Sequence, residues 1–451
     1  MSTKISQAHS FLIKLNDGLV LRRATRSDVE ALVEFNGQIH SDDGPEQPDE
    51  RVSAWTRDLL EVPHPTFNIE DFTVVEDTTR GVIVSSMNLI SQTWRYDGIP
   101  FGLGRPELVG TLPEYRNRGL VRAQFDVVHQ WSAGRGEKMQ AITGIPYYYR
   151  LFGYEMGLSL GGGRVGFTPH IPKLKAGEVE TYRIRPAGEG DLGFIAQLYE
   201  SATRRYRMSC VWDESQLRYE LGGKTARNVN RYELRVIETR QDERVGFLAH
   251  SHFNWGPTLP VVVYELIPGI SFTAVTPAVI RYLQKTGESY AAEAGKDPFG
   301  AFAFWMGEDH PVYQVIPDRL PRVRKPYAWY VRVPDLPDFL RHIAPALDRR
   351  MAASPLAGYS GEMKITFYRS GLRLVFENGR LVQADPWRPE PLGHSGDAGF
   401  PDLTFLQLLF GYRSLDELKY AFADCTTKTD EAYALLNILF PRQPSDVWPI
   451  S

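Results

Sequence analysis

The chain has 451 residues, a formal net charge of −4 and 43% hydrophobic residues, a composition that leaves room for about three globular domains. It has no general excess of basic residues, which argues against a nucleic-acid binder. Only two cysteines occur, Cys210 and Cys425, without paired spacing, so neither a disulfide framework nor a thiolate metal cluster is expected. Because no apolar run is long enough for a signal peptide or a membrane span, we expect a cytoplasmic protein without membrane attachment.

A strand followed by a helix opens the chain, and the same layout returns near its middle. The segment "DGLVLRRATRSDVEALVEFNGQI" predicts a strand at 19–23 and then a helix, which a capping box of Ser27 and Glu30 would begin. The stretch that starts at Thr181 repeats this layout. Each copy continues into two strands joined by a polar turn, at residues 72–90 and 232–253. An internal duplication is the economical interpretation.

A third segment follows the two copies. The linker "TPHIPKLKAGEVE" separates the copies, and the second closes near "YAWYVRVPDLPDF". In the third segment Asn378-Gly379 predicts a type I′ hairpin, and Asp402 and Ser414 are expected to cap helices. We therefore expect an α+β protein with three domains, at residues 1–170, 171–333 and 334–451.

An arginine-rich turn lies between a strand and a helix in the stretch "ELVGTLPEYRNRGLVRAQFDVV". Apolar residues recur at helical spacing from Leu120 onward, so this turn is predicted at a helix N-terminus. Free amides there carry a partial positive charge, and Gly119 lacks the Cβ atom that would block close approach. Because Arg118 and Arg122 add charge, the turn predicts a pyrophosphate site.

Two other sequence patterns are interpreted as structural rather than as binding sites. No P-loop follows the turn, and "GGGRVG", with Gly161, Gly163 and Gly166, imitates a dinucleotide fingerprint. The prolines of the following "FTPHIPK" deny it the required helix, so a glycine-rich strand edge is expected. His250 and His252 share one side of a strand without further ligands. They are interpreted as structural, and no metal is expected.

Two ordered motifs resemble those of the GNAT acetyltransferase superfamily. The stretch "TLPEYRNRGLVRA" resembles its Arg/Gln-x-x-Gly-x-Gly/Ala signature, with Val121 in place of the usual small sixth residue. Downstream, "ITGIPYYYRLFGYE" has the Tyr-x-x-x-Gly-Tyr pattern. Nearly the whole chain resembles Eis-like acetyltransferases, which consist of an active GNAT domain, a degenerate GNAT domain and a sterol-carrier-like domain. The corresponding passage of the second copy, "GISFTAVTPAVIRYLQK", has neither Arg nor Gly in its turn, so that copy should not bind CoA.

The resemblance implies a homohexamer that transfers acetyl from acetyl-CoA to an amine, often of a cationic small molecule such as an aminoglycoside or polyamine. It assigns the pantetheine and thioester to Val109, Gly110 and Thr111 on one side and to Gly144 and Ile145 on the other. It assigns the pyrophosphate to Asn117, Arg118, Gly119, Leu120, Val121 and Arg122.

The resemblance also assigns two proton-transfer groups. Tyr149 matches the general acid, and a phenol with pKa about 10 is protonated at neutral pH. Its alternative is a packed aromatic residue. By position, the carboxylate of Ser451 would accept the proton of the amine, and the apolar Val447, Trp448 and Ile450 would anchor the tail. The alternative is that the tail packs on the third domain and contributes only to stability.

The acceptor is not decided by the sequence. An acidic loop after the first helix could attract a cationic amine or could simply be solvated; its carboxylates are Asp42, Asp43, Glu46, Asp49 and Glu50. A protein-lysine acetyltransferase is a variant within the same class. A carrier of apolar ligands is the hypothesis from another class, because the third segment has the apolar helices "FPDLTFLQLLFGY" and "YALLNILF".

Overall fold

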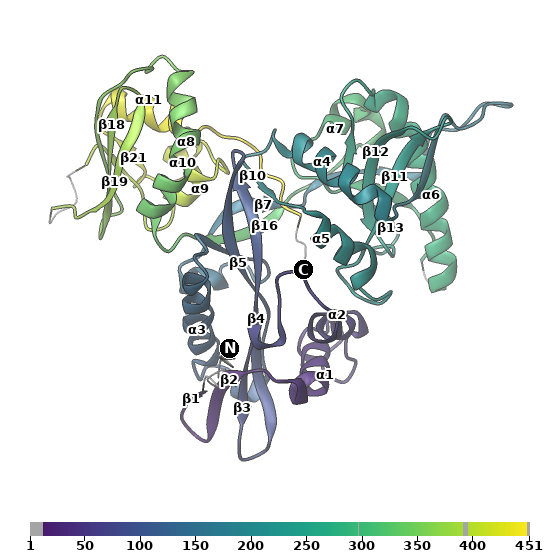
Figure 1. Ribbon diagram of the computed structural model, residues 1–451, viewed down its shortest axis with the longest axis horizontal. Coiled ribbons are helices and arrows are strands. Elements are labelled where there is room, and N and C mark those ends of the chain that lie inside the picture. Colours follow the sequence, from purple (N-terminus) through teal and green to yellow (C-terminus); the bar gives the residue numbers. More distant parts are fainter. Residues whose placement is uncertain (1–11, 296, 391–395, 449–451) are drawn as a thin grey trace, which may run out of the picture.

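The computed structural model describes residues 12–295, 297–390 and 396–448. Strands of these residues form three sheets, of nine, seven and five strands. Figure 1 shows three lobes, with the first part of the chain below, the second at the right and the third at the left. The expected α+β class is confirmed. No helix in the described ranges is both long and apolar enough to cross a membrane.

The nine-stranded sheet builds the first lobe. Its order is β1-β2-β3-β4-β5-β6-β16-β7, and β10 pairs with the far end of β4. Its strands are β1 (Leu12–Lys14), β2 (Leu19–Arg23), β3 (Phe72–Asp77), β4 (Val82–Tyr96), β5 (Ile99–Thr111), β6 (Met139–Ile142), β7 (Glu155–Leu160), β10 (Met208–Cys210) and β16 (Tyr327–Arg332). Helices α1 (Val29–Ile39) and α2 (Glu50–Glu61) pack on one face, and α3 (Leu120–Gly134) packs on the other.

The seven-stranded sheet builds the second lobe, in the order β15-β8-β14-β13-β12-β11-β9. Its strands are β8 (Gly163–Phe167), β9 (Tyr182–Pro186), β11 (Tyr232–Thr239), β12 (Arg244–Ser251), β13 (Thr258–Leu266), β14 (Ala301–Phe304) and β15 (Arg322–Arg324). Its helices are α4 (Leu192–Thr203), α5 (Glu214–Arg218), α6 (Phe272–Ala294) and α7 (Pro311–Val315). Val275, Val279 and Leu283 of α6 are buried in the core of this lobe.

The two sheets repeat one topology, and β8 and β16 exchange places between them. Strand β8 precedes the linker but lies between β14 and β15 of the second sheet. Strand β16 ends the second copy but lies between β6 and β7 of the first sheet. The boundaries expected at residues 170 and 333 stay predictions. The first sheet includes two strands from beyond residue 170, β10 and β16, and the second sheet includes β8 from before it.

The third lobe contains the five-stranded sheet β19-β18-β17-β20-β21. Its elements are β17 (Gly361–Thr366), β18 (Gly371–Glu377), β19 (Arg380–Trp387), β20 (Ala398–Gly399), β21 (Thr426–Thr427), α8 (Leu336–Ala352), α9 (Phe405–Leu409), α10 (Leu415–Ala421) and α11 (Asp430–Leu439). The type I′ hairpin is confirmed, because Asn378 and Gly379 have φ of 51° and 78°. Ser414 caps α10, accepting from the Glu417 amide at 3.1 Å.

Two predicted helix caps are wrong. Thr404, not Asp402, precedes α9. At α1 the capping box uses Thr25 and Asp28, because the Thr25 amide donates to the Asp28 carboxylate at 2.7 Å. The same carboxylate pairs with Arg22 at 2.7 Å. The capping carboxylate, Asp28, thus lies two residues before the expected Glu30 and also pairs with Arg22 of the neighbouring strand β2.

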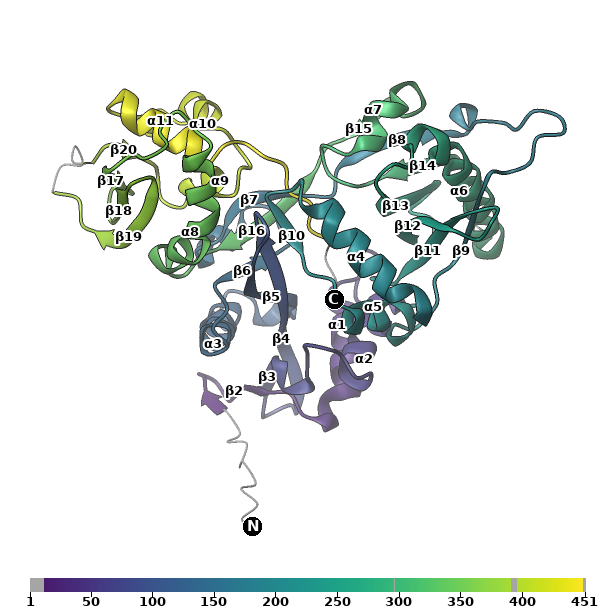
Figure 2. The ribbon, with the colours of Figure 1, turned by 45° about the horizontal axis from the view of Figure 1, so that its top comes forward.

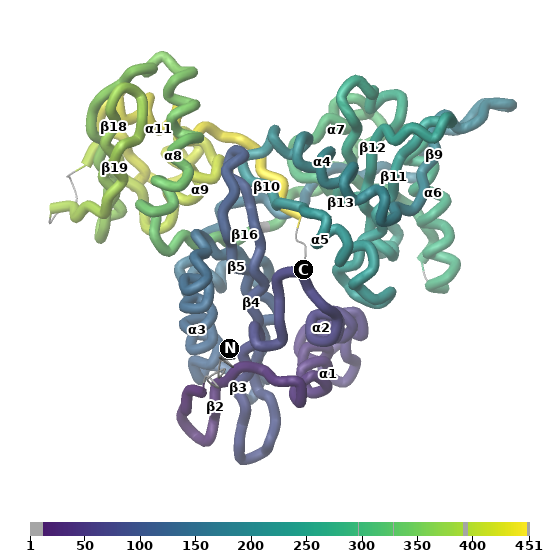
Figure 3. The backbone as a smooth tube through the Cα atoms, in the orientation of Figure 1, coloured from purple at the N-terminus to yellow at the C-terminus, as the bar shows by residue number. Residues whose placement is uncertain are grey.

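The C-terminal segment leaves the third lobe and runs along β10, as the yellow trace in Figure 3 shows. The Asp446 amide donates to the Met208 carbonyl at 3.1 Å, and the Cys210 thiol donates to the Trp448 carbonyl at 3.0 Å. The Trp448 ring lies against Trp212, with centroids 3.8 Å apart. Anchoring by Val447 and Trp448 is confirmed, since each is 3% exposed; Ile450 and Ser451 lie outside the described residues.

Candidate functional site

Strands β5 and β6 pair only over a short stretch, and the gap between their edges beyond it is called the cleft below. These parallel strands pair at Leu103–Met139 and Gly104–Gln140. Strand β5 then continues to Thr111, and no described strand pairs with that stretch on the β6 side. Two diverging strands leave backbone groups free on their facing edges. A linear ligand that needs backbone hydrogen bonds can therefore enter between them.

A bulge turns the end of β5 toward this cleft. The β4–β5 register shifts between Ser86–Gly110 and Asn88–Glu107, and Leu108 has φ of +51°. A non-glycine residue in that conformation is costly and marks a structurally imposed bend. The residues expected to contact pantetheine, Val109, Gly110 and Thr111, follow directly.

Close packing explains the glycine in this bend. A Cβ atom on Gly110 would lie 2.7 Å from Ile39 Cγ2 of α1 and 3.2 Å from Phe35 Cε1. The Gly110 carbonyl accepts a hydrogen bond from Ser85 Oγ at 2.7 Å, and Ser85 Oγ lies 2.8 Å from Thr111 Oγ1. The end of β5 is therefore held by both α1 and β4.

The N-terminus of α3 is open to an anion. Gly119 is the N-cap residue with φ of +77°, and no atom lies within 4 Å of the Cβ position it lacks. Asn117 is also left-handed, with φ of 62°. The first helical bond runs from the Ala123 amide to the Gly119 carbonyl at 3.0 Å, so the preceding amides have no partner within the helix. These amides and the helix dipole suit a phosphate group.

The side chains of the turn contribute less than expected. Arg118 pairs with Asp17 at 2.7 Å, so its charge is partly neutralised. The Arg122 guanidinium lies over the Phe152 ring at 5.0 Å. Leu120 is buried in the core, and Val121 is half-buried against the core that contains Phe125. An anion placed at this turn would therefore contact the backbone more than the arginines.

Tyr149 lies where β6 meets the cleft. It belongs to the short helix η4 (Tyr148–Phe152) and is 5% exposed. Gly144, at the end of β6, has φ of 122°, and a Cβ atom there would lie 3.3 Å from the Tyr149 hydroxyl oxygen. Burial and, to a smaller extent, the Glu107 carboxylate raise the pKa of the Tyr149 phenol. This phenol therefore stays protonated at neutral pH, while Ile145 beside it is 60% exposed.

The exchanged strand β16 supports the same loop. The Tyr147 amide donates to Tyr330 Oη at 2.6 Å, and Tyr327 Oη donates to the Gly144 carbonyl. Tyr147 has φ of +69°, so this contact holds a strained residue. Sequence reasoning missed both tyrosines because it assigned them to the second copy, and no local pattern reveals a strand exchange.

A buried charge pair also escaped the sequence analysis. Arg105 and Glu107 of β5 form an ion pair, and the Arg105 guanidinium lies 5.2 Å from the Trp329 ring centroid. Burial raises the pKa of Glu107 although Arg105 opposes this. Opposite Glu107 on β4, the Asn88 side-chain amide is buried and has no hydrogen-bond partner among the described residues. The interior of the protein is therefore polar where β4 and β5 pair at Asn88 and Glu107.

Two carboxylates of the acidic loop have structural roles. Asp49 caps α2, accepting from the Arg51 amide at 2.8 Å, and Glu50 pairs with Arg227 at 2.9 Å. Asp42, Asp43 and Glu46 are exposed. Attraction of a substrate by these three residues stays a prediction.

The remaining motifs have structural roles too. His250 bonds to the Ser251 carbonyl at 2.7 Å and to the Tyr282 hydroxyl at 2.9 Å. Gly163 and Gly166 lie in β8, where a Cβ atom would collide with Phe304 and Phe302. The expected glycine-rich strand is therefore confirmed. The apolar helices of the third segment are core, since Phe405, Leu408, Leu409, Leu435 and Leu436 are buried.

Comparisons with known proteins agree with this geometry. Residues 20–157 match the family model of the acetyltransferase (GNAT) domain. No curated protein sequence matches the chain.

Among solved structures, a probable N-acyltransferase from Enterococcus faecalis V583 has a TM-score of 0.66 at 13% identity, covering 96% of this chain and 100% of that one. A GCN5-related N-acetyltransferase from Kribbella flavida has a TM-score of 0.61 at 19% identity, covering 95% and 97%. Eis1 from Mycobacterium abscessus has a TM-score of 0.58 at 13% identity, covering 95% and 99%. Residues 20–157 are thus a domain of the acetyltransferase (GNAT) family, which uses an acyl-CoA co-substrate, and nearly the whole chain has the fold of Eis1.

Proposed function

We propose that the protein transfers the acetyl group of acetyl-CoA to an amine of a cationic small molecule, such as an aminoglycoside or a polyamine. The observation that carries this proposal is the alignment of three features in the first lobe: the open amides at Gly119, the separated β5 and β6, and the Tyr149 hydroxyl beside Gly144. Together they provide a phosphate site, a slot for a linear chain and a proton donor.

The cleft fits an acyl-CoA in order along its length. Amides of residues 117–122 would hold the pyrophosphate, because helix N-termini stabilise anions. The pantetheine would lie between the edge of Val109–Thr111 and that of Gly144–Ile145. Its amides would then bond to backbone groups that the diverging strands leave free.

Acetyl transfer then needs one attack and two proton movements. The amine nitrogen attacks the thioester carbonyl carbon, a C–N bond forms and the C–S bond breaks. The departing thiolate takes the Tyr149 phenol proton, and the buried phenol is suited to this because it stays protonated. The amine loses its extra proton to a base. We assign that role to the Ser451 carboxylate, which lies outside the described residues.

Charge and position favour a cationic acceptor. The exposed Asp42, Asp43 and Glu46 follow α1, and Ile39 at the end of α1 borders Gly110 at the cleft. Carboxylates near a cleft raise the local concentration of cations. A homohexamer, as in the Eis-like resemblance, completes the proposal.

The test is thiol release from acetyl-CoA with a panel of aminoglycosides, polyamines and lysine peptides. We expect turnover with the polycationic small molecules and little with the peptides. Turnover with lysine peptides alone would make the protein a protein-lysine acetyltransferase. Absence of turnover with every amine, in a protein that binds acetyl-CoA, would contradict the proposed acceptor class.

A further inference from the structure

A second pocket lies in the second lobe, away from the cleft. It has a volume of about 530 Å³ and lies at the edge formed by β14, β8 and β15. Figure 2 shows these three strands together at the top of that lobe. Val165 and Phe167 of β8 line it together with Trp305, which follows β14. Its walls are therefore largely apolar and partly aromatic.

Three cations line the same pocket, Arg322, Arg324 and Lys325. No carboxylate belongs to the lining, and none of the three makes an ion pair with any residue that the structure describes. The Arg324 guanidinium lies over the Trp305 ring, 3.8 Å from its centroid. The indole Nε1 of Trp305 is buried without an acceptor in the described part of the chain. The pocket therefore offers positive charge and a donor with no negative counterpart.

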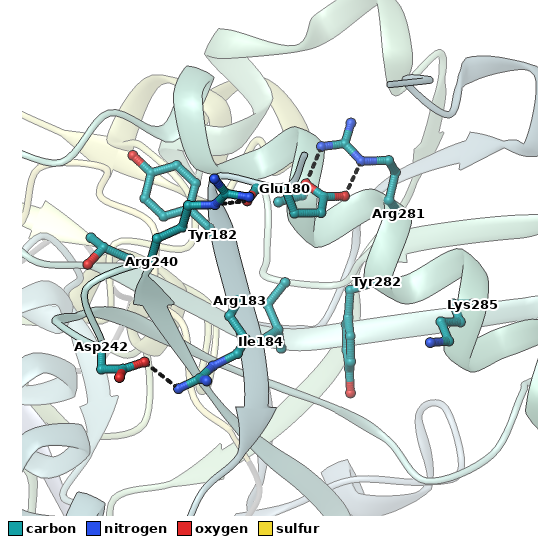
Figure 4. Close-up of a pocket in the computed structure, with 11 residues that line it drawn as sticks. Glu180, Tyr182, Arg183, Ile184, Arg240, Asp242, Arg281, Tyr282 and Lys285 are labelled. Atoms are coloured by element: carbon teal, nitrogen blue, oxygen red, sulfur yellow. Dashed lines mark hydrogen bonds and ion pairs between the residues drawn. The ribbon is translucent and has the colours of Figure 1, made fainter. Parts of the chain in front are cut away.

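In another pocket of the same lobe, at the opposite edge of the sheet beside β9, the arginines are paired with carboxylates of the protein itself. Figure 4 shows Arg281 bound to Glu180 and Arg183 bound to Asp242. The Arg183–Asp242 pair measures 2.8 Å, and Arg183 also bonds to Glu238 at 2.6 Å. Arginines at that pocket thus have internal partners. The cations beside β15 do not, so their charge is available to a ligand.

Arg324 is exposed, but its guanidinium is partly desolvated where it lies over the Trp305 ring. Burial lowers the pKa of the Arg324 guanidinium, and no carboxylate opposes this shift. A guanidinium remains charged in proteins, so a bound anion would offset the loss of hydration. The stacked Arg324 and Trp305 also form a flat, polarisable surface on which planar groups stack favourably.

From this geometry we propose that the pocket between β8, β14 and β15 binds a phosphorylated planar aromatic compound, the chemistry of a nucleotide. The phosphate would pair with Arg322 and Lys325, which are exposed at the pocket. Guanidinium and ammonium groups both recognise phosphate. The ring would lie against the aromatic wall. Phosphate alone would lack the apolar contact, and a neutral nucleoside would lack the charge.

The test uses the full-length Gly119→Val variant without CoA, because CoA has a phosphorylated adenine of its own and would also fill the pocket, whereas the substitution obstructs the phosphate position at the start of α3. Adenosine 5′-monophosphate is then titrated by calorimetry, with adenosine and inorganic phosphate as separate titrations. We expect one site per chain for the monophosphate and at least tenfold weaker binding of the other two probes. The double variant Arg322→Glu, Lys325→Glu should lose this binding, and Lys285→Glu, an exposed cation of the pocket in Figure 4, should retain it.

Several outcomes would overturn the proposal. No binding of adenosine 5′-monophosphate, or equal binding after Arg322→Glu, Lys325→Glu is added, would remove the site. Equal affinity for inorganic phosphate would reduce it to a simple anion site. A change of molecular mass in light scattering of the double variant would instead identify the pocket as a contact between copies of the chain. Acetyl-CoA affinity of the double variant should stay within about twofold of wild type, so this test is separate from the proposed acetyl transfer.

Discussion

The first and second lobes share a strand order, but among the described residues only the first has the open helix start that we propose as the anion site. Both sheets have a register shift at corresponding central strands, between Ser86 and Asn88 in β4 and between Ala249 and His250 in β12. The helices that follow differ: α3 begins at the left-handed Gly119, whereas α6 begins after Ser271 in an extended conformation. The topology is thus retained without the site, which depends on a few residues at one helix start.

The strand exchange shows the same asymmetry. In the first sheet β16 brings Tyr327 and Tyr330 onto the loop beside Tyr149. In the second sheet β8 brings Gly163 and Gly166 into close packing against Phe304 and Phe302. The exchange is reciprocal in topology, but only β16 adds hydrogen bonds to a candidate site. The second lobe therefore contributes to the first lobe's cleft.

The largest expected effect comes from removing the proton donor. Tyr149→Phe should lower kcat by about 10²- to 10⁴-fold, the range for general acid catalysis, with acetyl-CoA affinity unchanged. Steady-state kinetics and calorimetry measure the two quantities. Tyr148→Phe is the matched control and should keep full turnover. If the Tyr149 variant is as active as wild type, Tyr149 is only a packing residue.

The second-largest effect is expected from removal of the last two residues. A chain that ends at Pro449 retains the docked Trp448 but lacks the Ser451 carboxylate, so kcat should fall by about 10- to 100-fold through loss of a proton acceptor. The same thermal midpoint and acetyl-CoA affinity as wild type would show that folding is intact. Full turnover by the shortened chain would move the search for a base to the acidic loop.

A bulky residue at Gly119 should remove the phosphate-binding capacity that distinguishes the first lobe from the second. Gly119→Val adds strain of about 1–3 kcal/mol at positive φ and obstructs the phosphate, so acetyl-CoA affinity should fall at least tenfold. Gly295→Val is the control, because Gly295 ends α6 with φ of +59° and also has open space around its Cβ position. It should cost stability and leave acetyl-CoA affinity intact. Equal affinity losses in both variants would point to a general folding defect.

Removal of one hydroxyl tests the contribution of β16. Tyr330→Phe deletes the acceptor for the Tyr147 amide, a loss of about 1 kcal/mol. The KM for acetyl-CoA should rise about fivefold, while the thermal midpoint changes little. The control Tyr368→Phe removes a hydroxyl that bonds to the Asp424 carbonyl in the third lobe. A KM equal to that of the wild type in the Tyr330 variant would show that β16 contributes to the sheet but not to acetyl-CoA binding.

The smallest effect is shared by both lobes and concerns acid stability. Burial lowers the pKa of His129 in α3 to about 3 and that of His250 in β12 to about 4. The unfolded chain binds protons as pH falls below about 6.5, but these folded histidines do not, so stability decreases from there down to about pH 4. Urea midpoints at pH 7 and pH 5 measure this decrease. His129→Gln should show a smaller difference between the two, and an unchanged difference would contradict the assignment.

Local patterns predicted most of the elements, and the site of the first lobe stays a prediction. The hairpin at Asn378-Gly379 and the open helix start at Gly119 follow from backbone rules that act over a few residues. The exchange of β8 and β16 did not follow, because strand order depends on contacts between distant segments. Arg105 and Glu107 were missed for a similar reason: their spacing on a strand indicates only a shared face, and their burial comes from packing with Trp329.

The central claim is that one lobe of a duplicated fold binds the co-substrate. Calorimetric titration with acetyl-CoA tests it most directly, in the full-length variant Arg322→Glu, Lys325→Glu so that the proposed pocket beside β15 does not contribute. The account predicts one binding site per chain. Two sites per chain, or one site whose affinity is unaffected by Gly119→Val, would contradict it.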